Sequence, residues 1–250
     1  MSILNDLQKP WESALSSVYP YLGKAEGPAC TPLSFDAEKA GVTPTRHTAG
    51  ASFAKPRVVI PVFPGTNCEY DSARAFERVG GIAKTVIVNN LTPQAVEETV
   101  TAMAEAIKRA QILMLPGGFS GGDEPDGTGK FIAAMFRAPQ IAEAVHRLLH
   151  DHDGLILGIC NGFQALLKLG LLPYGEITDL DENTPTLTYN NIGRHVSQTV
   201  RVRVASNLSP WLSGVDVGDT HTLAVSHGEG RFYADGHTVA ALRVRGQIAT

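Results

Sequence analysis

The stretch GLILGICNGFQAL, residues 154–166, places a lone cysteine between two glycines, at the point where an apolar run changes to a helical pattern. The first five residues suit a buried strand, and the residues from Gly162 onward suit a helix. Because Gly158 and Gly162 allow a tight turn from strand to helix, the pattern is typical of a nucleophile elbow around Cys160. We therefore predict that Cys160 is a nucleophile, against the alternative that it is a small buried hydrophobic residue.

This position has two consequences for the Cys160 thiol. Open α/β sheets bind their ligands at the carboxyl ends of parallel strands, so we expect Cys160 to line a crevice. The start of a helix carries a partial positive charge, which favours a thiolate over a thiol. Both effects favour nucleophilic chemistry at this cysteine.

Strands and helices alternate on both sides of this stretch. Strands are predicted over 57–63, 84–88, 111–115 and 154–158, and helices over 70–79, 92–110, 139–149 and 162–169. Ala73, Phe76 and Val79 should share one face of the first helix. Thr92 should cap the second helix, with Pro93 at its first position. The alternation predicts an α/β fold, with a mostly parallel sheet flanked by helices.

Two other regions follow different patterns. Residues 1–55 contain five prolines and a small, polar stretch, which predicts a leader or linker on the surface, ahead of one domain over 56–250. Its apolar cluster either docks on a partner or packs on the chain's own domain; the members are Trp11, Tyr19, Tyr21 and Leu22. Beyond Leu172, residues 196–206 and 221–234 are β-rich, which predicts an antiparallel extension of the sheet.

The composition excludes several classes of function. The chain has 250 residues, of which 43% are hydrophobic and 18% charged, and its net charge of −4 argues against binding to nucleic acid or anionic lipid. No apolar run reaches the roughly 18 residues of a membrane span, and no secretory signal is found. The three widely spaced cysteines, Cys30, Cys68 and Cys160, predict a reducing, cytoplasmic location. Without CxxC or HExxH motifs, no metal site is expected.

The glycine-rich stretch over 113–130 resembles a phosphate cradle but fails the tests for one. A P-loop needs Ser or Thr after Gly-Lys, and here Phe131 follows Lys130. We instead expect Gly117 and Gly118, at the end of the neighbouring strand, to present backbone N–H groups as an oxyanion hole beside Cys160.

A second thiol competes with Cys160 for the catalytic role. Cys68 also follows a strand, but it stands in a polar turn without the second glycine. We interpret Asn67 and the turn as capping and Cys68 as a helix-start residue, with the alternative that Cys68 lines the same crevice as Cys160.

Five segments together resemble one family. MLPGGFSGGDEPDGTGKF, LGICNGFQAL and VSHGEGRF, with FPGTNCEYD and PTLTYNNIGRH, are similar to the glutamine amidotransferase domain of phosphoribosylformylglycinamidine synthase. The resemblance covers residues 57–250 and implies the flavodoxin-like fold of class I glutamine amidotransferases. The leader resembles the tail that joins the synthetase and amidotransferase parts in the fused form of that enzyme.

The resemblance implies a reaction and a set of site residues. Cys160 would attack the side-chain amide of L-glutamine to form a thioester. The ammonia released would pass to a synthetase domain or subunit, where ATP and Mg are expected, to amidate formylglycinamide ribonucleotide; no cofactor is expected in this chain. The oxyanion hole would consist of Gly117, Gly118 and Asn161. Residues expected to bind glutamine are Phe119, Gln164, Ser226, His227, Gly228 and Glu229.

One departure from the family pattern concerns the general base. Class I members complete a triad with a His-x-Glu pair near the C-terminus, and His227 and Glu229 have that spacing. They align, however, with a separate SHGEG segment of the family, so we expect this chain to lack the triad pair and the domain to be incomplete at its C-terminus. The alternatives are a catalytically impaired fragment that binds glutamine or docks on the synthetase, and a DJ-1-like cysteine hydrolase.

Overall fold

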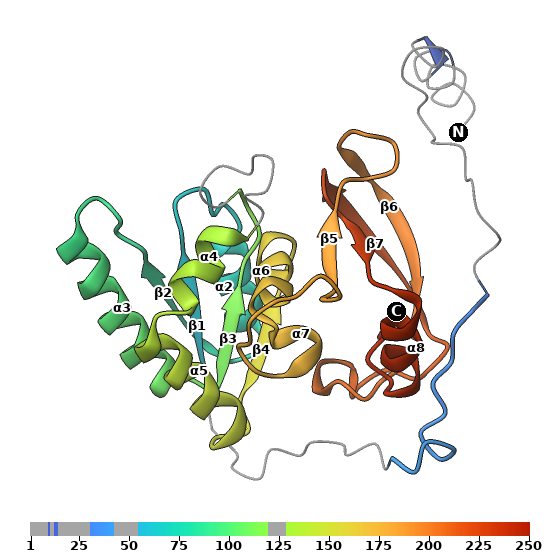
Figure 1. Ribbon diagram of the computed structural model, residues 1–250, viewed down its shortest axis with the longest axis horizontal. Coiled ribbons are helices and arrows are strands. Elements are labelled where there is room, and N and C mark those ends of the chain that lie inside the picture. Colours follow the sequence, from blue (N-terminus) through green and yellow to red (C-terminus); the bar gives the residue numbers. More distant parts are fainter. Residues whose placement is uncertain (1–9, 11–12, 15–30, 43–54, 120–128) are drawn as a thin grey trace.

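The computed structural model describes residues 10, 13–14, 31–42, 55–119 and 129–250. Its centre is a four-stranded parallel sheet in the order β2-β1-β3-β4 (Figure 1). The strands are β1 (Arg57–Val62), β2 (Ile82–Ile87), β3 (Ile112–Leu115) and β4 (Leu155–Gly158). All four predicted strands are confirmed, and β3 lies between β1 and the strand that leads to Cys160.

Helices cover both faces of this sheet. They are α2 (Glu69–Arg78), α3 (Pro93–Lys108), α4 (Lys130–Phe136), α5 (Pro139–His150), α6 (Asn161–Leu169) and the short α7 (Leu171–Tyr174). Residues of α3, α4, α5 and α6 pack in one large core with one face of the sheet, and α2 packs on the other face. The predicted cap of α3 is confirmed, because Thr92 Oγ1 accepts a hydrogen bond from Ala95 N at 3.1 Å.

The apolar face of α2 is shorter than the sequence predicts. Ala73 and Phe76 pack against the core of Val58, Ile60 and Met114. Val79 does not join them, because α2 ends at Arg78 and the chain turns away, which leaves Val79 83% exposed. Its assignment to the buried face was therefore wrong.

The C-terminal part contains the predicted antiparallel strands, which form two separate two-stranded sheets rather than joining the parallel sheet. β5 (Thr186–Thr188) pairs with β8 (Arg231–Tyr233), and β6 (Val196–Arg203) pairs with β7 (Thr220–His227). The 3-10 helix η1 (Pro210–Leu212) and α8 (Gly236–Val244) complete this part. In Figure 1 these elements stand beside the β4 and α6 end of the parallel sheet, and β5 contacts α6.

Trp211 joins the two parts at the sheet edge. β4 is an edge strand, and the Trp211 indole Nε1 donates a hydrogen bond to Ile156 O at 3.1 Å. The indole ring also meets Phe76 of α2 edge-on, with ring centroids 6.3 Å apart. One side chain of η1 therefore occupies part of the exposed edge of the strand that leads to Cys160.

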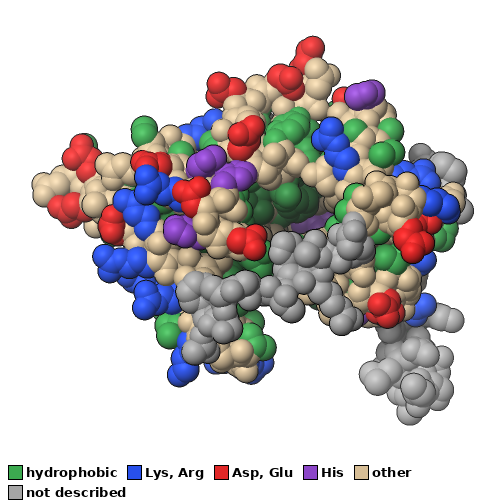
Figure 2. Space-filling view, turned by 90° about the horizontal axis from the view of Figure 1, so that it is seen from below, with side chains coloured by type: hydrophobic (Ala, Val, Ile, Leu, Met, Phe, Trp, Pro, Cys, Tyr) green, Lys and Arg blue, Asp and Glu red, His purple; other side chains and the backbone are tan. Residues whose placement is uncertain are grey.

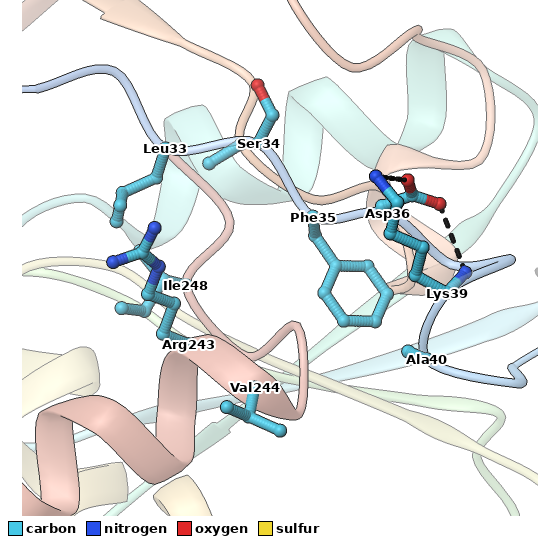
Figure 3. A pocket seen from close by; sticks show the side chains of 10 residues that line it. Leu33, Ser34, Phe35, Asp36, Lys39, Ala40, Arg243, Val244 and Ile248 are labelled. Atoms are coloured by element: carbon cyan, nitrogen blue, oxygen red, sulfur yellow. Dashed lines mark hydrogen bonds and ion pairs between the residues drawn. The ribbon is translucent and has the colours of Figure 1, made fainter.

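The longest described stretch of the leader, residues 31–42, lies on the C-terminal part. Arg203 donates hydrogen bonds to Leu33 O at 2.6 Å and to Ser34 Oγ at 3.1 Å, and Phe35 N donates to Ala205 O at 2.8 Å. This segment, Ala205 and the C-terminal residues from Arg243 line a cavity of about 230 Å³, into which the Phe35 ring projects (Figure 3). The cavity shares no residue with the surroundings of Cys160. The predicted cluster around Trp11 lies outside the described residues.

The surface carries charges of both signs. Viewed from below, hydrophobic side chains gather in a hollow near the centre of the molecule, with basic and acidic side chains interspersed around it (Figure 2). Within the described residues, no helix combines the length and the apolar character that crossing a lipid bilayer requires.

Candidate active site

Cys160 lies at a strained turn between β4 and α6. Its backbone has φ 53° and ψ −112°, a region that residues with a side chain rarely adopt. Two hydrogen bonds close the turn, from Gly162 N to Ile159 O at 2.9 Å and from Gln164 N to Cys160 O at 3.0 Å. Such conformations cost about 1–3 kcal/mol and persist only where the surrounding structure enforces them. The predicted turn from strand to helix at Cys160 is confirmed, and Cys160 is exposed rather than buried.

The two glycines around Cys160 allow the helix to approach the sheet closely. A Cβ atom on Gly162 would collide with the carbonyl oxygen of Leu115 and lie 2.6 Å from its carbonyl carbon. A Cβ atom on Gly158 would lie 2.6 Å from Leu166 Cδ1 and 2.8 Å from the backbone of Gly162. The tight turn therefore depends on close packing against β3 as well as on backbone freedom.

Gly117 and Gly118 face the elbow from the end of β3. An added Cβ on Gly117 would lie 3.2 Å from Cys160 Cβ, so this backbone lies directly beside Cys160. Gly118 has φ 137°, and a Cβ there would lie 2.5 Å from Gly65 O, because this glycine forms a bridge with Thr66. Within the described residues, the Gly118 N–H donates to no hydrogen bond, which is compatible with the predicted oxyanion hole.

Phe119 follows Gly118 in the chain, and its backbone N–H is hydrogen-bonded. Its N–H donates to Gly65 O at 2.8 Å, and its side chain is 54% exposed. No described contact joins Phe119 to the elbow, so its expected role in glutamine binding stays a prediction.

Cys68 lines the same crevice, which is the alternative that the sequence left open. The Cβ position on Gly117 that touches Cys160 is also 3.7 Å from Cys68 Sγ. Burial raises the pKa of the Cys68 thiol, and the charges of Cys160, Asp71 and Glu69 raise it further. Because a raised pKa means less thiolate near neutral pH, Cys68 is a poorer nucleophile than an ordinary cysteine.

The capping role expected of Asn67 was wrong. Cys68 itself is the N-cap residue of α2, and no side chain caps the helix by a hydrogen bond. Asn67 Oδ1 instead accepts a hydrogen bond from Cys68 Sγ at 3.0 Å.

Asn161 and Gln164 connect the elbow to the segment over 226–230. Asn161 Nδ2 donates to Gln164 Oε1 at 3.2 Å, and Gln164 Nε2 donates to Glu229 O at 3.1 Å. Both side chains are almost fully buried. The first turn of α6 thus holds the SHGEG segment beside the Cys160 elbow, which brings together residues that lie 65 positions apart in the sequence.

Asn190 organises that segment, and sequence reasoning missed it. Its Nδ2 donates to His227 O at 2.8 Å, its Oδ1 pairs with His227 Nδ1 at 2.9 Å and accepts from Gly230 N at 3.2 Å, and its N–H donates to Gly228 O at 3.1 Å. A buried asparagine with all these bonds fixes the turn. The only available signal was its place in PTLTYNNIGRH, one of the family segments.

The side chains of His227 and Ser226 form hydrogen bonds with residues outside the Cys160 elbow. The His227 ring bonds to Asn190 and lies so close over Gly230 that a Cβ there would collide with it. Ser226 Oγ pairs with His195 Nε2 at 2.9 Å on the exposed β6–β7 pair. Among the described residues, no hydrogen bond joins Cys160 Sγ to a histidine.

Comparison with known proteins agrees with this geometry. Residues 55–250 match the family model described as the CobB/CobQ-like glutamine amidotransferase domain. The chain is 33% identical over 195 residues to the phosphoribosylformylglycinamidine synthase subunit PurQ of Rubrobacter xylanophilus, covering 77% of this chain and 73% of that protein. The chain belongs to this family of glutamine amidotransferases.

Two further members support the assignment. PurQ of Dehalococcoides mccartyi is 36% identical over 179 residues, covering 71% of this chain and 63% of the relative. The solved structure of PurLQS from Thermotoga maritima has a TM-score of 0.54 and 27% identity, covering 72% of this chain and 70% of that one. The class I amidotransferase fold is therefore confirmed. The chain spans between about three fifths and three quarters of the length of these family members.

Proposed function

We propose that this chain is the glutaminase part of phosphoribosylformylglycinamidine synthase, an enzyme of purine biosynthesis. The observation that carries the proposal is the strained Cys160 elbow, with the backbone of Gly117 beside it and Gly118 next in the chain. This arrangement pairs an exposed nucleophile with backbone donors, which is what acyl transfer from an amide requires.

The reaction would proceed through a thioester. Cys160 Sγ attacks the side-chain carbonyl carbon of L-glutamine, and the carbonyl oxygen becomes an oxyanion near the Gly118 and Asn161 N–H groups. Collapse of this intermediate breaks the C–N bond and, with a proton on the nitrogen, releases ammonia. Water then attacks the thioester and releases glutamate, which restores the thiol.

The segment held by Asn190 would bind the amino-acid end of glutamine. The 228–230 turn is fastened to Gln164 on one side and to Asn190 on the other, so its backbone is rigid before substrate arrives. Gly228 has open space around its Cβ position. Ordered polar groups beside open space favour tight positioning of a small ligand.

Ammonia would be consumed by a synthetase partner. In the proposed enzyme, the synthetase subunit would bind ATP and Mg and use the ammonia to amidate formylglycinamide ribonucleotide. The relatives named above are subunits of such an enzyme. We propose the same kind of assembly for this chain.

A diazo-ketone analogue of glutamine tests the assignment of the nucleophile. We expect it to modify Cys160 before Cys68, because burial and nearby negative charges raise the pKa of Cys68. Mass spectrometry of the digested protein would locate the label, and excess L-glutamine should slow labelling. Cys68 labelling should become appreciable only as the pH rises, because its thiolate forms later than that of an ordinary cysteine. A label found first on Cys68 would reverse the assignment.

A second function has one observation in its favour. Among the described residues, no histidine forms a hydrogen bond with Cys160 Sγ. The alternative function is therefore a module that binds glutamine, or docks on the synthetase, without hydrolysing glutamine. Ammonia release, measured with the synthetase subunits present, separates the two. Analogue labelling together with glutamine-dependent ammonia release supports the glutaminase, whereas labelling without release supports the binding module.

His227→Ala tests whether the His-x-Glu spacing over 227–229 is catalytic. We expect the rate of Cys160 alkylation by iodoacetamide to stay within about twofold of the original, because His227 bonds to Asn190. His195→Ala, which removes another imidazole from the same part of the chain, is the matched control. A loss on the order of 100-fold, specific to His227→Ala, would show that His227 is the general base.

A further inference from the structure

Two thiols meet across a glycine at the centre of the candidate site. β1 and β4 lie on either side of β3, and the chain continues from them to Cys68 and to Cys160. Between the two stands Gly117, whose missing side chain leaves the space open. A single Cβ position there is 3.2 Å from Cys160 Cβ and 3.7 Å from Cys68 Sγ. Both cysteines are free.

We propose that Cys68 is the resolving thiol for oxidation of Cys160, so that a hydroperoxide converts the pair to a reversible disulfide. This inference goes beyond the proposed glutaminase function and needs only the nucleophilic character of Cys160. The site takes a small peroxide as its oxidant, and glutamine bound at Cys160 would exclude it.

The chemistry balances in two steps. The Cys160 thiolate attacks one peroxide oxygen, the O–O bond breaks, and the sulfur becomes a sulfenic acid while water, or an alcohol from an organic hydroperoxide, leaves. The Cys68 thiolate then attacks that sulfur, the S–S bond forms, the S–O bond breaks, and the hydroxide leaves as water after protonation. Two electrons, one from each thiol, have passed to the peroxide.

The surroundings favour this order of events. Before oxidation, negative charge on Cys160 is one of the causes that raise the pKa of Cys68, after burial. A sulfenic acid carries no such charge, so oxidation of Cys160 removes this repulsion and makes Cys68 easier to ionise. Cys68 thus becomes a better nucleophile once its partner can accept an attack.

One of the hydrogen bonds that attach the Cys68 loop to the end of β3 is weak. Asn67, the neighbour of Cys68, is attached to the end of β3 by a hydrogen bond of 3.5 Å from its N–H to Gly117 O, which is long for such a bond. The flanking residues Pro64 and Gly65 are exposed. The loop is also held by the bond from Phe119 N to Gly65 O at 2.8 Å and by that from Ser72 N to Cys68 O at 3.0 Å. Disulfide formation therefore requires a local adjustment at Cys68 that brings the sulfurs to bonding distance.

The test uses the full reduced chain treated with hydrogen peroxide. Trypsin digestion without reductant places Cys68 in the peptide over 58–74 and Cys160 in the peptide over 148–168. We expect the two peptides to be linked, with the mass of their sum less two hydrogens, and dithiothreitol to separate them. Labelling of Cys160 by the glutamine analogue should be lost on oxidation and regained on reduction.

Cys68→Ser is the decisive variant, and Cys30→Ser is its control. Serine keeps the size of Cys68 and its hydrogen bond to Asn67, so the fold should be retained. In Cys68→Ser, Cys160 should proceed to sulfinic acid, which dithiothreitol does not reverse, whereas Cys30→Ser should behave like the original chain.

Three outcomes would overturn the proposal. They are an unreacted Cys160, a sulfinic Cys160 in the original chain without a link to Cys68, and a disulfide that joins Cys160 to Cys30 or to another molecule. A chain that is labelled by the glutamine analogue but not linked contradicts only this inference. If the Cys68–Cys160 disulfide forms but the glutamine analogue never labels the reduced protein, only the proposed function is contradicted.

Discussion

Gly162→Ala is expected to lower the free energy of unfolding by about 3 kcal/mol and the melting temperature by about 10 °C. Alanine is the better helix former by about 1 kcal/mol, so intrinsic propensity alone predicts the opposite sign. The added Cβ, however, would collide with the Leu115 carbonyl oxygen and lie 2.8 Å from Leu115 Cβ. These are atoms of a central strand that cannot move without disturbing the sheet, so steric overlap determines the result.

The same substitution should also disturb the chemistry. Displacing α6 from β3 moves Cys160 away from the backbone of Gly117, so labelling by the glutamine analogue should slow even in protein that remains folded. Thermal unfolding and the labelling rate are the two measurements.

Gly236→Ala provides the matched control. Gly236 also stands at the start of a helix, α8, but nothing lies within 4 Å of its Cβ position. Alanine there should be neutral or stabilising by up to about 1 kcal/mol. Equal melting temperatures for the two alanine variants would contradict the packing argument.

Cys160→Gly is expected to abolish reactivity while making the protein more stable. Removing the nucleophile should reduce any glutamine-dependent ammonia release by about 10⁴-fold or more and eliminate labelling by the analogue at this site. Glycine adopts φ 53° without penalty, so the free energy of unfolding should rise by about 1–2 kcal/mol. If the free energy of unfolding rises when the thiol is removed in this way, the backbone of Cys160 is strained in the native protein.

Cys160→Ala separates the two effects. It removes the sulfur as glycine does but keeps a Cβ in the strained conformation, so it should be equally unreactive without the gain in stability. Melting curves and mass spectrometry of the three proteins would show this. If Cys160→Gly were no more stable than Cys160→Ala, the backbone at residue 160 would not be strained.

The nucleophile elbow and the order of strands and helices follow from local sequence. The GICNG pattern predicts a turn between strand and helix because the glycines that allow the turn lie within two positions of Cys160, although the close packing against β3 that also supports the turn is not local. The cap at Thr92 depends on Thr92 itself and on Ala95, three positions away. The antiparallel character of the C-terminal part also appears as alternation along single strands. In the helix cap the interacting groups are neighbours in the chain, and in the strands the alternation itself is local although the paired residues are distant, so a short window of sequence contains the pattern.

The assembly of the site around that elbow was decided by the tertiary structure. Gln164 reaches Glu229 across 65 residues, Asn190 holds His227 across 37, and Trp211 caps the edge of β4 across 55. No local pattern specifies which side chain stands across an interface when strands and loops pack, because that depends on the placement of whole elements. The position of Cys68 is the clearest case. Its sequence context left open whether it entered the crevice, and only the order β1-β3-β4, with a glycine at the end of β3, put the two thiols on either side of one small gap.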